Sequence, residues 1–183
     1  MASNLWFTSD SHFSHYNIIK YSNRPFESVQ EMNERMIELW NERVRPQDHI
    51  YHLGDVSMCR PRHIKELMAR LNGHKRLVRG NHDIFHTKEY MEVGWEEIYG
   101  IRVLENFIFT HIPIHPASMA NFRANVHGHT HDQPDLSPMM KINPKTQEVR
   151  WQHYLNISVE KTNYHPISLE DIRQSVRSLS QID

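Results

Sequence analysis

Short apolar runs that end at a turn and a polar side chain constrain the fold of this chain more than any other feature. Six segments have the composition of short strands: 5–9, 49–53, 76–78, 101–104, 107–110 and 154–159. Three of the six glycines, Gly54, Gly80 and Gly128, directly precede polar residues. Glycine permits a tight turn and a close backbone approach there. Because ligand sites in layered α/β folds form beyond the carboxyl ends of strands, this pattern predicts a polar site at a sheet edge.

Helical patterns lie between these runs. Apolar residues at three- and four-residue spacing predict a helix over 29–44. Pro61 predicts the start of a second helix, which 72–73 (Asn-Gly) ends. Ser168 and Asp171 resemble a capping box and predict a closing helix. Strands alternating with helices, followed by a strand-rich second half, indicate an α/β fold with at least one mixed sheet.

Length and charge narrow the class of protein. The 183 residues fit a single domain, 1–183, and the net charge of -1 argues against a non-specific grip on long nucleic acid. No apolar run approaches the roughly 20 residues of a membrane span, and the first residues do not resemble a signal peptide. The single cysteine, Cys59, excludes an internal disulfide framework, so we expect a cytoplasmic location. Segment 132–147 predicts a long irregular surface excursion.

Histidine is unusually frequent, with 15 in the chain, and metal sites and proton transfer use imidazoles heavily. Several histidines stand with Asp or Asn in five short motifs: Asp10-Ser-His12, Gly54-Asp55, Gly80-Asn81-His82-Asp83, His111 and Gly128-His129-Thr130-His131. Most of these motifs directly follow a predicted strand. Their carboxylate, imidazole and amide donors suit Mn, Fe, Zn, Ni or Co better than Ca.

The number of candidate ligands indicates more than one ion. Seven side chains in the motifs are candidate metal ligands: Asp10, His12, Asp55, Asn81, His111, His129 and His131. Seven donors exceed one tetrahedral site and fit two neighbouring divalent ions that share a carboxylate. Such two-metal sites hold their ions about 3.5–4 Å apart and catalyse hydrolysis.

The order D-x-H, G-D, G-N-H-D, H and G-H-x-H, from Asp10 to His131, resembles the calcineurin-like metallophosphoesterase superfamily. The segments FTSDSHFSHYNII and YHPISLEDI resemble a group of small bacterial and phage-borne members. The resemblance implies a four-layer α/β fold. In that fold two mixed β-sheets pack face to face as a sandwich with flanking helices, and the metals lie at the carboxyl ends of strands.

The resemblance also implies roles for individual residues. One metal would be held by Asp10, His12, Asp55 and His131, and the other by Asp55, Asn81, His111 and His129, which makes Asp55 the bridge. His82 would face the substrate phosphate and act as an acid, and Asp83 beside it could orient its ring. Mn is the favoured metal of the two-ion centre.

Departures from better-known members narrow the substrate. Gly54-Asp55 is followed by VSMCR rather than V-D-R-G, so Cys59 stands where protein phosphatases and diadenosine tetraphosphate hydrolases carry a phosphate-binding arginine. This favours a phosphodiesterase for a small or nucleotide-type ester, with nucleic-acid ends as further possible substrates. Two alternatives stay open: a phosphomonoesterase, and a non-catalytic protein-binding scaffold of the same fold. The sequence does not indicate the oligomeric state.

Three further residues are candidate substrate contacts. Arg24 in YSNRPF could reach a phosphate, His15 could lie near the metal rim, and His115 could face the substrate from a loop. Each also fits an ordinary surface or structural role. The 132–147 excursion follows His131 directly and is the candidate specificity loop.

Overall fold

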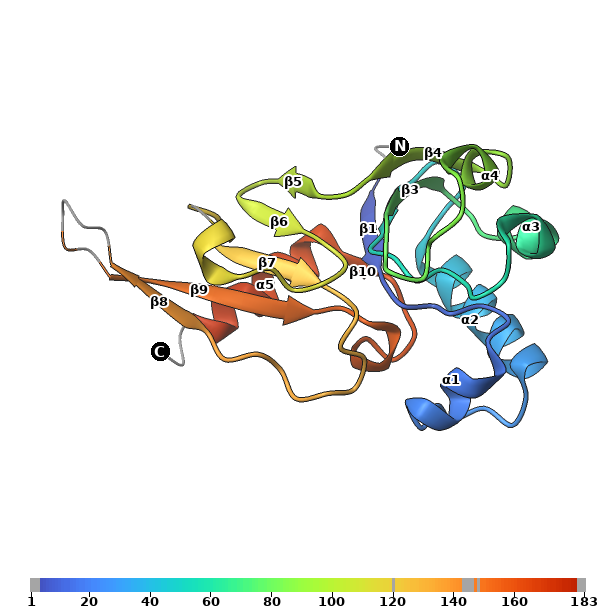
Figure 1. Cartoon of the computed structure of the whole chain (residues 1–183), viewed down its shortest axis with the longest axis horizontal. Coiled ribbons are helices and arrows are strands. Elements are labelled where there is room, and N and C mark those ends of the chain that lie inside the picture. The colour runs from blue at the N-terminus through green and yellow to red at the C-terminus, as the bar shows by residue number, and fades with distance from the viewer. Residues whose placement is uncertain (1–3, 120, 143–146, 148, 181–183) are drawn as a thin grey trace.

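Four parallel strands and one short antiparallel strand form the first sheet, in the order β10-β1-β2-β3-β4 (Figure 1). The computed structural model describes residues 4–119, 121–142, 147 and 149–180. The strands of this sheet are β1 (Leu5–Thr8), β2 (His49–His52), β3 (His74–Val78), β4 (Trp95–Tyr99) and β10 (Ile167–Ser168). The parallel strands begin and end together, so their carboxyl ends share one edge.

The second sheet is also mixed, in the order β5-β6-β7-β9-β8. Its strands are β5 (Arg102–Leu104), β6 (Phe107–Phe109), β7 (Ala124–His127), β8 (Met139–Ile142) and β9 (Val149–Asn156). β6, β7 and β9 are parallel, whereas β5 and β8 run antiparallel at the two borders. β8 and the start of β9 project from the body at the end opposite α2 and α3 (Figure 1).

The helices are α1 (Tyr16–Tyr21), α2 (Val29–Arg43), α3 (Lys65–Ala69), α4 (Thr87–Met91) and α5 (Leu169–Leu179). Four helices, α1 to α4, lie on the outer side of the first sheet, and α5 packs against β9 and β10. The predicted helices at 29–44 and after Ser168 are confirmed: the Ser168–Asp171 capping box is formed at α5. The helix predicted from Pro61 begins as a 3-10 turn, Pro61–Ile64, before α3. Within the described residues, no helix combines the length and apolar character needed to cross a membrane.

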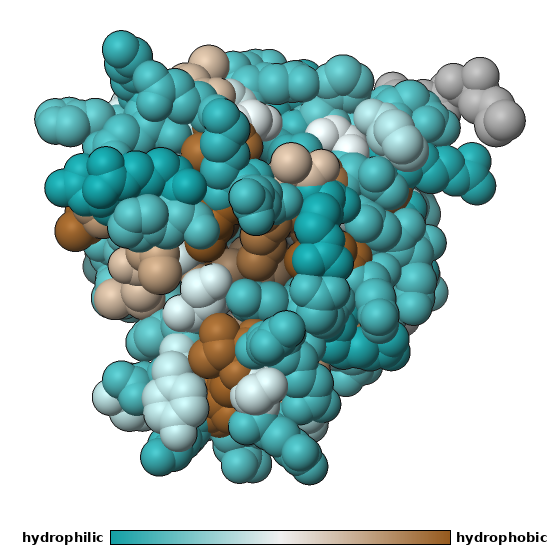
Figure 2. All heavy atoms as spheres, turned by 90° about the vertical axis from the view of Figure 1, so that its right-hand side faces the viewer, coloured by the Kyte–Doolittle hydropathy of each residue, from teal (hydrophilic) through white to brown (hydrophobic). Residues whose placement is uncertain are grey.

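Two apolar clusters hold these layers together. One lies between the sheets, where Phe7 of β1 stacks on Phe109 of β6 at 4.6 Å between ring centroids. The other packs α2 and α3 against the outer face of the first sheet, with Met32 and Met68 fully buried. The outer surface at the end of α2 and α3 is largely hydrophilic, with apolar side chains gathered in a narrow band (Figure 2). The expected sandwich of two mixed sheets with flanking helices is therefore confirmed.

The structure corrects several boundaries. The excursion predicted to be irregular over 132–147 contains β8, which pairs antiparallel with β9, although 143–146 lie outside the described residues. β4, β7, β10, α1 and α4 were not predicted. β7 was not predicted from the sequence because the polar residues Asn125 and His127 interrupt its apolar pattern. Both are buried, and the Asn125 amide donates to the Ile108 carbonyl at 3.0 Å.

Candidate metal centre

The predicted metal ligands follow the carboxyl ends of parallel strands in both sheets. Asp10 follows β1, Asp55 follows β2, Asn81 follows β3, His111 follows β6, and His129 follows β7. Contacts across the two edges join them, since the His129 amide donates to the Asp10 carboxylate at 2.9 Å. The two sheets therefore present their ligand loops to one another, and segments far apart in the sequence meet at one rim.

Six of the seven predicted ligands form two compact groups. Group one is Asp10, His12 and His131, and group two is Asp55, His111 and His129. In each group the three candidate ligand atoms all lie within 4.8 Å of one another. The seventh, Asn81, places its amide oxygen 2.9 Å from Nε2 of His111 and so borders group two.

Asp55 stands between the two groups. Its Oδ2 lies 3.3 Å from Nε2 of His111 and 3.7 Å from Nε2 of His12. Burial alone would raise the pKa of Asp55, but the His111 hydrogen bond and charge, with the His82 amide, hold it at about 2. The carboxylate is therefore ionised at neutral pH and placed where one group could share it with the other.

The side chains of group one fit a bound cation. His12 is 2% exposed, and neither of its ring nitrogens has a hydrogen-bond partner among the described residues. Burial lowers the pKa of His12 to about 2, so the imidazole is neutral and offers a lone pair. Burial also raises the pKa of the Asp10 carboxyl. An unpartnered buried polar group costs about 1–3 kcal/mol, and a metal ion between these side chains would remove that cost.

The backbone at the ligands is strained in a way that aims their side chains. Asp10, His12, Asp55, His129 and His131 all have left-handed backbone conformations, with φ between 48° and 69°. Each such residue costs on the order of 1–3 kcal/mol and persists only where its surroundings enforce it. Here the amides of Asp10 and His12 donate to the carbonyls of Gly54 and Asp55, each at 3.0 Å.

Two of the motif glycines are required by this packing. Gly54 has φ +94°, and a Cβ there would lie 2.8 Å from Nδ1 of His111. A Cβ on Gly128 would overlap Ser9 Oγ and the Asp10 carboxylate. The close backbone approach predicted from the sequence is thus present at these loops.

A buried ion pair supports group one and corrects the prediction for Arg24. Arg24 is 4% exposed, and its guanidinium donates to Glu160 Oε1 at 2.7 Å. It also donates to the carbonyls of Asp10 at 2.7 Å and Ser11 at 2.8 Å. Arg24 therefore holds the turn between the ligands of group one and does not face a substrate phosphate.

Glu160 was missed by the sequence reasoning. Its Oε1 accepts from Nδ1 of His131 at 3.0 Å, which leaves Nε2 of that ring directed at Asp10, 3.8 Å away. A carboxylate in this position fixes the tautomer of a metal-binding histidine and raises its basicity. The available signal was its place shortly after β9, the same strand-then-acid pattern that marked Asp10 and Asp55.

Hydrogen bonds to the backbone support group two. They also correct the role predicted for Asp83. The carbonyl of Leu53 accepts from Nδ1 of His111 at 2.8 Å. The buried Asp83 carboxylate accepts from the amides of Asp55 at 2.8 Å and Gly80 at 2.9 Å. Asp83 therefore ties together the loops after β2 and β3 rather than orienting the ring of His82.

His82 stands at the border of the site. Its amide donates to Asp55 Oδ1 at 2.9 Å, which fixes its position beside the Asp55 carboxylate. Its side chain is 42% exposed, with Nε2 3.9 Å from Asp55 Oδ2. The ring is thus close to both groups and open to solvent, unlike the buried rings of His12 and His111.

An open cavity of about 440 Å³ adjoins the two groups. Its lining comes from the ligand loops, α1 and the start of the excursion: His12, His15, Asn17, Ile18, Tyr21, Ser22, Met58, His82, His129, Thr130, His131, Asp132 and Gln133. Of the three predicted substrate contacts, only His15 lines it. His115 lies outside this lining and is exposed, and its Nδ1 accepts from the Ala117 amide at 3.2 Å.

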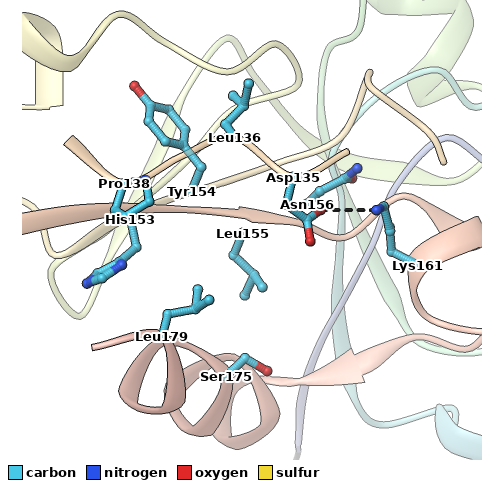
Figure 3. A pocket seen from close by; sticks show the side chains of 10 residues that line it. All are labelled: Asp135, Leu136, Pro138, His153, Tyr154, Leu155, Asn156, Lys161, Ser175 and Leu179. Carbon is cyan, nitrogen blue, oxygen red and sulfur yellow. Dashed lines mark ion pairs between the residues drawn. The ribbon is translucent and has the colours of Figure 1, made fainter. Parts of the chain in front are cut away.

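The rest of the excursion turns to a different cavity. Asp135, Leu136 and Pro138 line a hollow of about 360 Å³ between β9 and α5, where Asp135 pairs with Lys161 at 3.1 Å (Figure 3). None of the predicted ligands lines this second hollow. Of the described residues in the predicted specificity loop, only Asp132 and Gln133 line the cavity beside the candidate ligands.

Comparisons with known proteins identify the family of the chain. Residues 4–147 match the family model of the calcineurin-like phosphoesterase superfamily domain. The uncharacterized protein MJ1445 of Methanocaldococcus jannaschii is 38% identical over 172 residues, which is 91% of this chain and 87% of that protein. The gene 66 protein of Mycobacterium phage L5 is 33% identical over 84 residues, covering 44% of this chain and 40% of that protein.

One solved structure shows the same fold over nearly the whole chain. A protein of unknown function from Aquifex aeolicus, AQ665, superimposes with a TM-score of 0.67 at 23% identity, covering 94% of this chain and 99% of that one. The nuclease MPE of Pseudomonas putida gives a TM-score of 0.46 at 21% identity, covering 69% and 61%. The AQ665 structure extends the likeness in fold over nearly the whole chain.

Proposed function

The chain belongs to the calcineurin-like phosphoesterase superfamily, and from that premise we propose that it is a phosphodiesterase for small or nucleotide-type esters. The superfamily supports a metal-dependent phosphoesterase, and the two His/Asp groups are candidate sites for divalent ions. The choice of diesters, the paired ions and the single domain over 1–183 are our proposals, as is the cytoplasmic location suggested by the single cysteine.

The position of Asp55 carries the two-ion proposal. Its Oδ2 is within 4 Å of a histidine in each group, so in this proposal one carboxylate would serve both ions. Asp10, His12, Asp55 and His131 would hold one ion, and Asp55, Asn81, His111 and His129 the other. When bound, such a pair activates water at neutral pH and neutralises charge on the phosphate oxygens. Mn suits this donor set, as do Fe, Zn, Ni and Co.

His82 is the proposed acid. Its ring borders the cavity beside the shared carboxylate and is the exposed one among the histidines close to Asp55. In its protonated form the ring would donate a proton to the departing alkoxide oxygen as the phosphorus–oxygen bond breaks. The hydrogen bond from its amide to Asp55 keeps the ring at the same place relative to the ligands.

The charge of the cavity favours diesters. Its thirteen described lining residues include neither lysine nor arginine, and they do include Asp132. A phosphodiester carries one negative charge, whereas a monoester at neutral pH approaches two and needs further cationic partners. Arg24, the one arginine that the sequence offered for this purpose, is committed to Glu160.

Hydrolysis of two model esters tests the proposal. With added Mn²⁺, we expect faster turnover of bis-p-nitrophenyl phosphate than of p-nitrophenyl phosphate, and no turnover of either after chelation. A preference for p-nitrophenyl phosphate would instead indicate a phosphomonoesterase. If neither ester is hydrolysed, with or without added Mn²⁺, the result would support the non-catalytic scaffold.

A further inference from the structure

We propose that the part of the cavity lined by α1 binds a nucleoside base, with Tyr21 as the stacking surface. This inference rests on the proposed function, because it assigns the part of a phosphodiester substrate that lies beyond the reacting phosphate. It names the substrate as a nucleoside phosphodiester rather than an alkyl or lipid ester.

The lining of the cavity falls into two chemically different parts. One part is His12, His82, His129 and His131, which are or adjoin the candidate ligands. The other part, the α1 end, comes from α1 and the loop after β2, with the exposed Tyr21 and Met58 beside the buried Ile18. A ligand whose phosphate meets the histidines therefore extends toward an apolar surface. The volume of about 440 Å³ lies within the range of small-molecule sites, about 300–1,000 Å³.

Tyr21 offers an aromatic face at this end. Its side chain is among the most exposed large apolar residues described, at 74%, and Met58 is 43% exposed. The tyrosine ring meets His15 edge to face, with centroids 6.5 Å apart and planes at 75°. The tyrosine ring thus lies beside His15 in the lining of the cavity. Aromatic side chains in such positions stack on bases of any sequence, because every base has a π face.

Polar lining residues of the same cavity suit the edge of a base. Asn17 and Gln133 line the cavity with amide groups that both donate and accept hydrogen bonds, and Asp132 adds an acceptor. The described lining contains neither lysine nor arginine to follow a further phosphate. Binding of a long nucleic-acid strand depends on such contacts. The cavity therefore fits a single nucleoside attached to the reacting phosphate better than a polynucleotide.

A matched pair of substrates isolates the base. Uridine 5′-(methyl phosphate) and the same sugar phosphate with a methoxy group in place of uracil differ only beyond the sugar. Each ester is hydrolysed in the presence of Mn²⁺, and ³¹P NMR measures the product. The kcat/KM values of the two esters are then compared as a ratio. We expect the base-bearing ester to be preferred by roughly 5- to 150-fold, the effect of one base–aromatic stack. The Tyr21→Ala ratio should fall close to one, through a higher KM, while Tyr21→Phe keeps the preference.

Tyr16→Ala is the matched control. Tyr16 lies on the same helix and is 59% exposed, but it does not line the cavity. Its variant should retain the wild-type ratio. If the wild type hydrolyses bis-p-nitrophenyl phosphate but shows a ratio near one, or if Tyr21→Ala keeps the preference, the base-binding wall is refuted while the phosphodiesterase stands.

A binding measurement tests the inference independently of ester hydrolysis. Saturation-transfer NMR on the metal-free protein with uridine 5′-(methyl phosphate) reports which ligand protons contact the protein. Saturation of the uracil protons in the wild type and its loss in Tyr21→Ala supports the proposal. Absence of uracil saturation in the wild type overturns it, whatever the esterase assays give.

Discussion

The two candidate metal groups are alike in their ligands but differ in what holds them. In group one, His131 rests on Glu160, and Glu160 on Arg24, a buried ion pair between residues 136 positions apart. In group two, His111 rests on the backbone carbonyl of Leu53, and Asp83 binds amides of the neighbouring loops. The side chain behind His131 can be removed by one substitution, whereas the backbone carbonyl behind His111 cannot. The two groups should therefore respond differently to mutation.

Replacing Asp55 should have the largest effect, because in the proposed two-ion centre both groups depend on its carboxylate. Asp55→Ala is expected to abolish measurable esterase activity and to reduce bound metal from two ions to one or none per chain. Metal content by plasma mass spectrometry after gel filtration measures this. Asp132→Asn removes a carboxylate of the cavity that belongs to neither group, and it should keep both ions. Retention of two ions by Asp55→Ala would show that Asp55 is not shared.

His82 belongs to neither group, so its loss should separate catalysis from metal binding. For His82→Ala we expect a fall in turnover of about 10²–10⁴, the size of a lost acid or base, with metal content unchanged. The assay is hydrolysis of bis-p-nitrophenyl phosphate on protein of measured metal content. A parallel loss of metal would mean that His82 is itself a ligand.

Glu160→Gln should sharpen the difference between the groups. Loss of the carboxylate behind His131 is expected to weaken one metal-binding step about 10- to 100-fold and to leave the other in place. Calorimetric titration with Mn²⁺ resolves the two steps. Circular dichroism checks that the variant folds, because Arg24 loses its charged partner. Equal weakening of both steps would remove the distinction between the groups.

The smallest expected effect is on stability alone and concerns Asp48. This residue lies at the end of the first sheet opposite the ligand loops. Burial would raise the pKa of Asp48, but the amides of Asn4 and Arg45 and the Trp6 indole donate to its carboxylate and hold the pKa below 3.8. A depressed folded-state pKa stabilises the fold above the unfolded value of about 3.9, and this stability is lost as pH falls through the folded value.

Asp48→Asn is therefore expected to lower the free energy of unfolding of the metal-free protein by about 1–3 kcal/mol at pH 7. The loss should shrink as the pH is taken below 4. Urea unfolding at both pH values measures it, with the exposed Glu66→Gln as control. An equal loss at pH 7 and pH 3 would mean that the ionised carboxylate is not the stabilising form.

Residues whose role depends on their own strand or turn could be predicted from the sequence. Asp10, Asp55 and His111 were found because each directly follows a short apolar run, and parallel strands bring such ends to one edge. The helix over 29–44 followed from spacing alone. These signals are local, and the fold preserves them.

Residues whose role depends on distant partners could not be predicted. Arg24 looks like a solvent-exposed loop cation in the sequence, yet Glu160 and two carbonyls bury it. Asp83 looks like a partner for its neighbour His82, but the loop geometry turns its carboxylate to backbone amides. β7 was hidden because its buried Asn125 is satisfied by the neighbouring strand.

Electron paramagnetic resonance of the protein titrated with Mn²⁺ tests the shared site most directly. If Asp55 joins the two groups, two equivalents should bind and give the spectrum of exchange-coupled ions about 3.5–4 Å apart. Saturation at one equivalent, or two ions with the spectra of isolated Mn²⁺, would contradict the account.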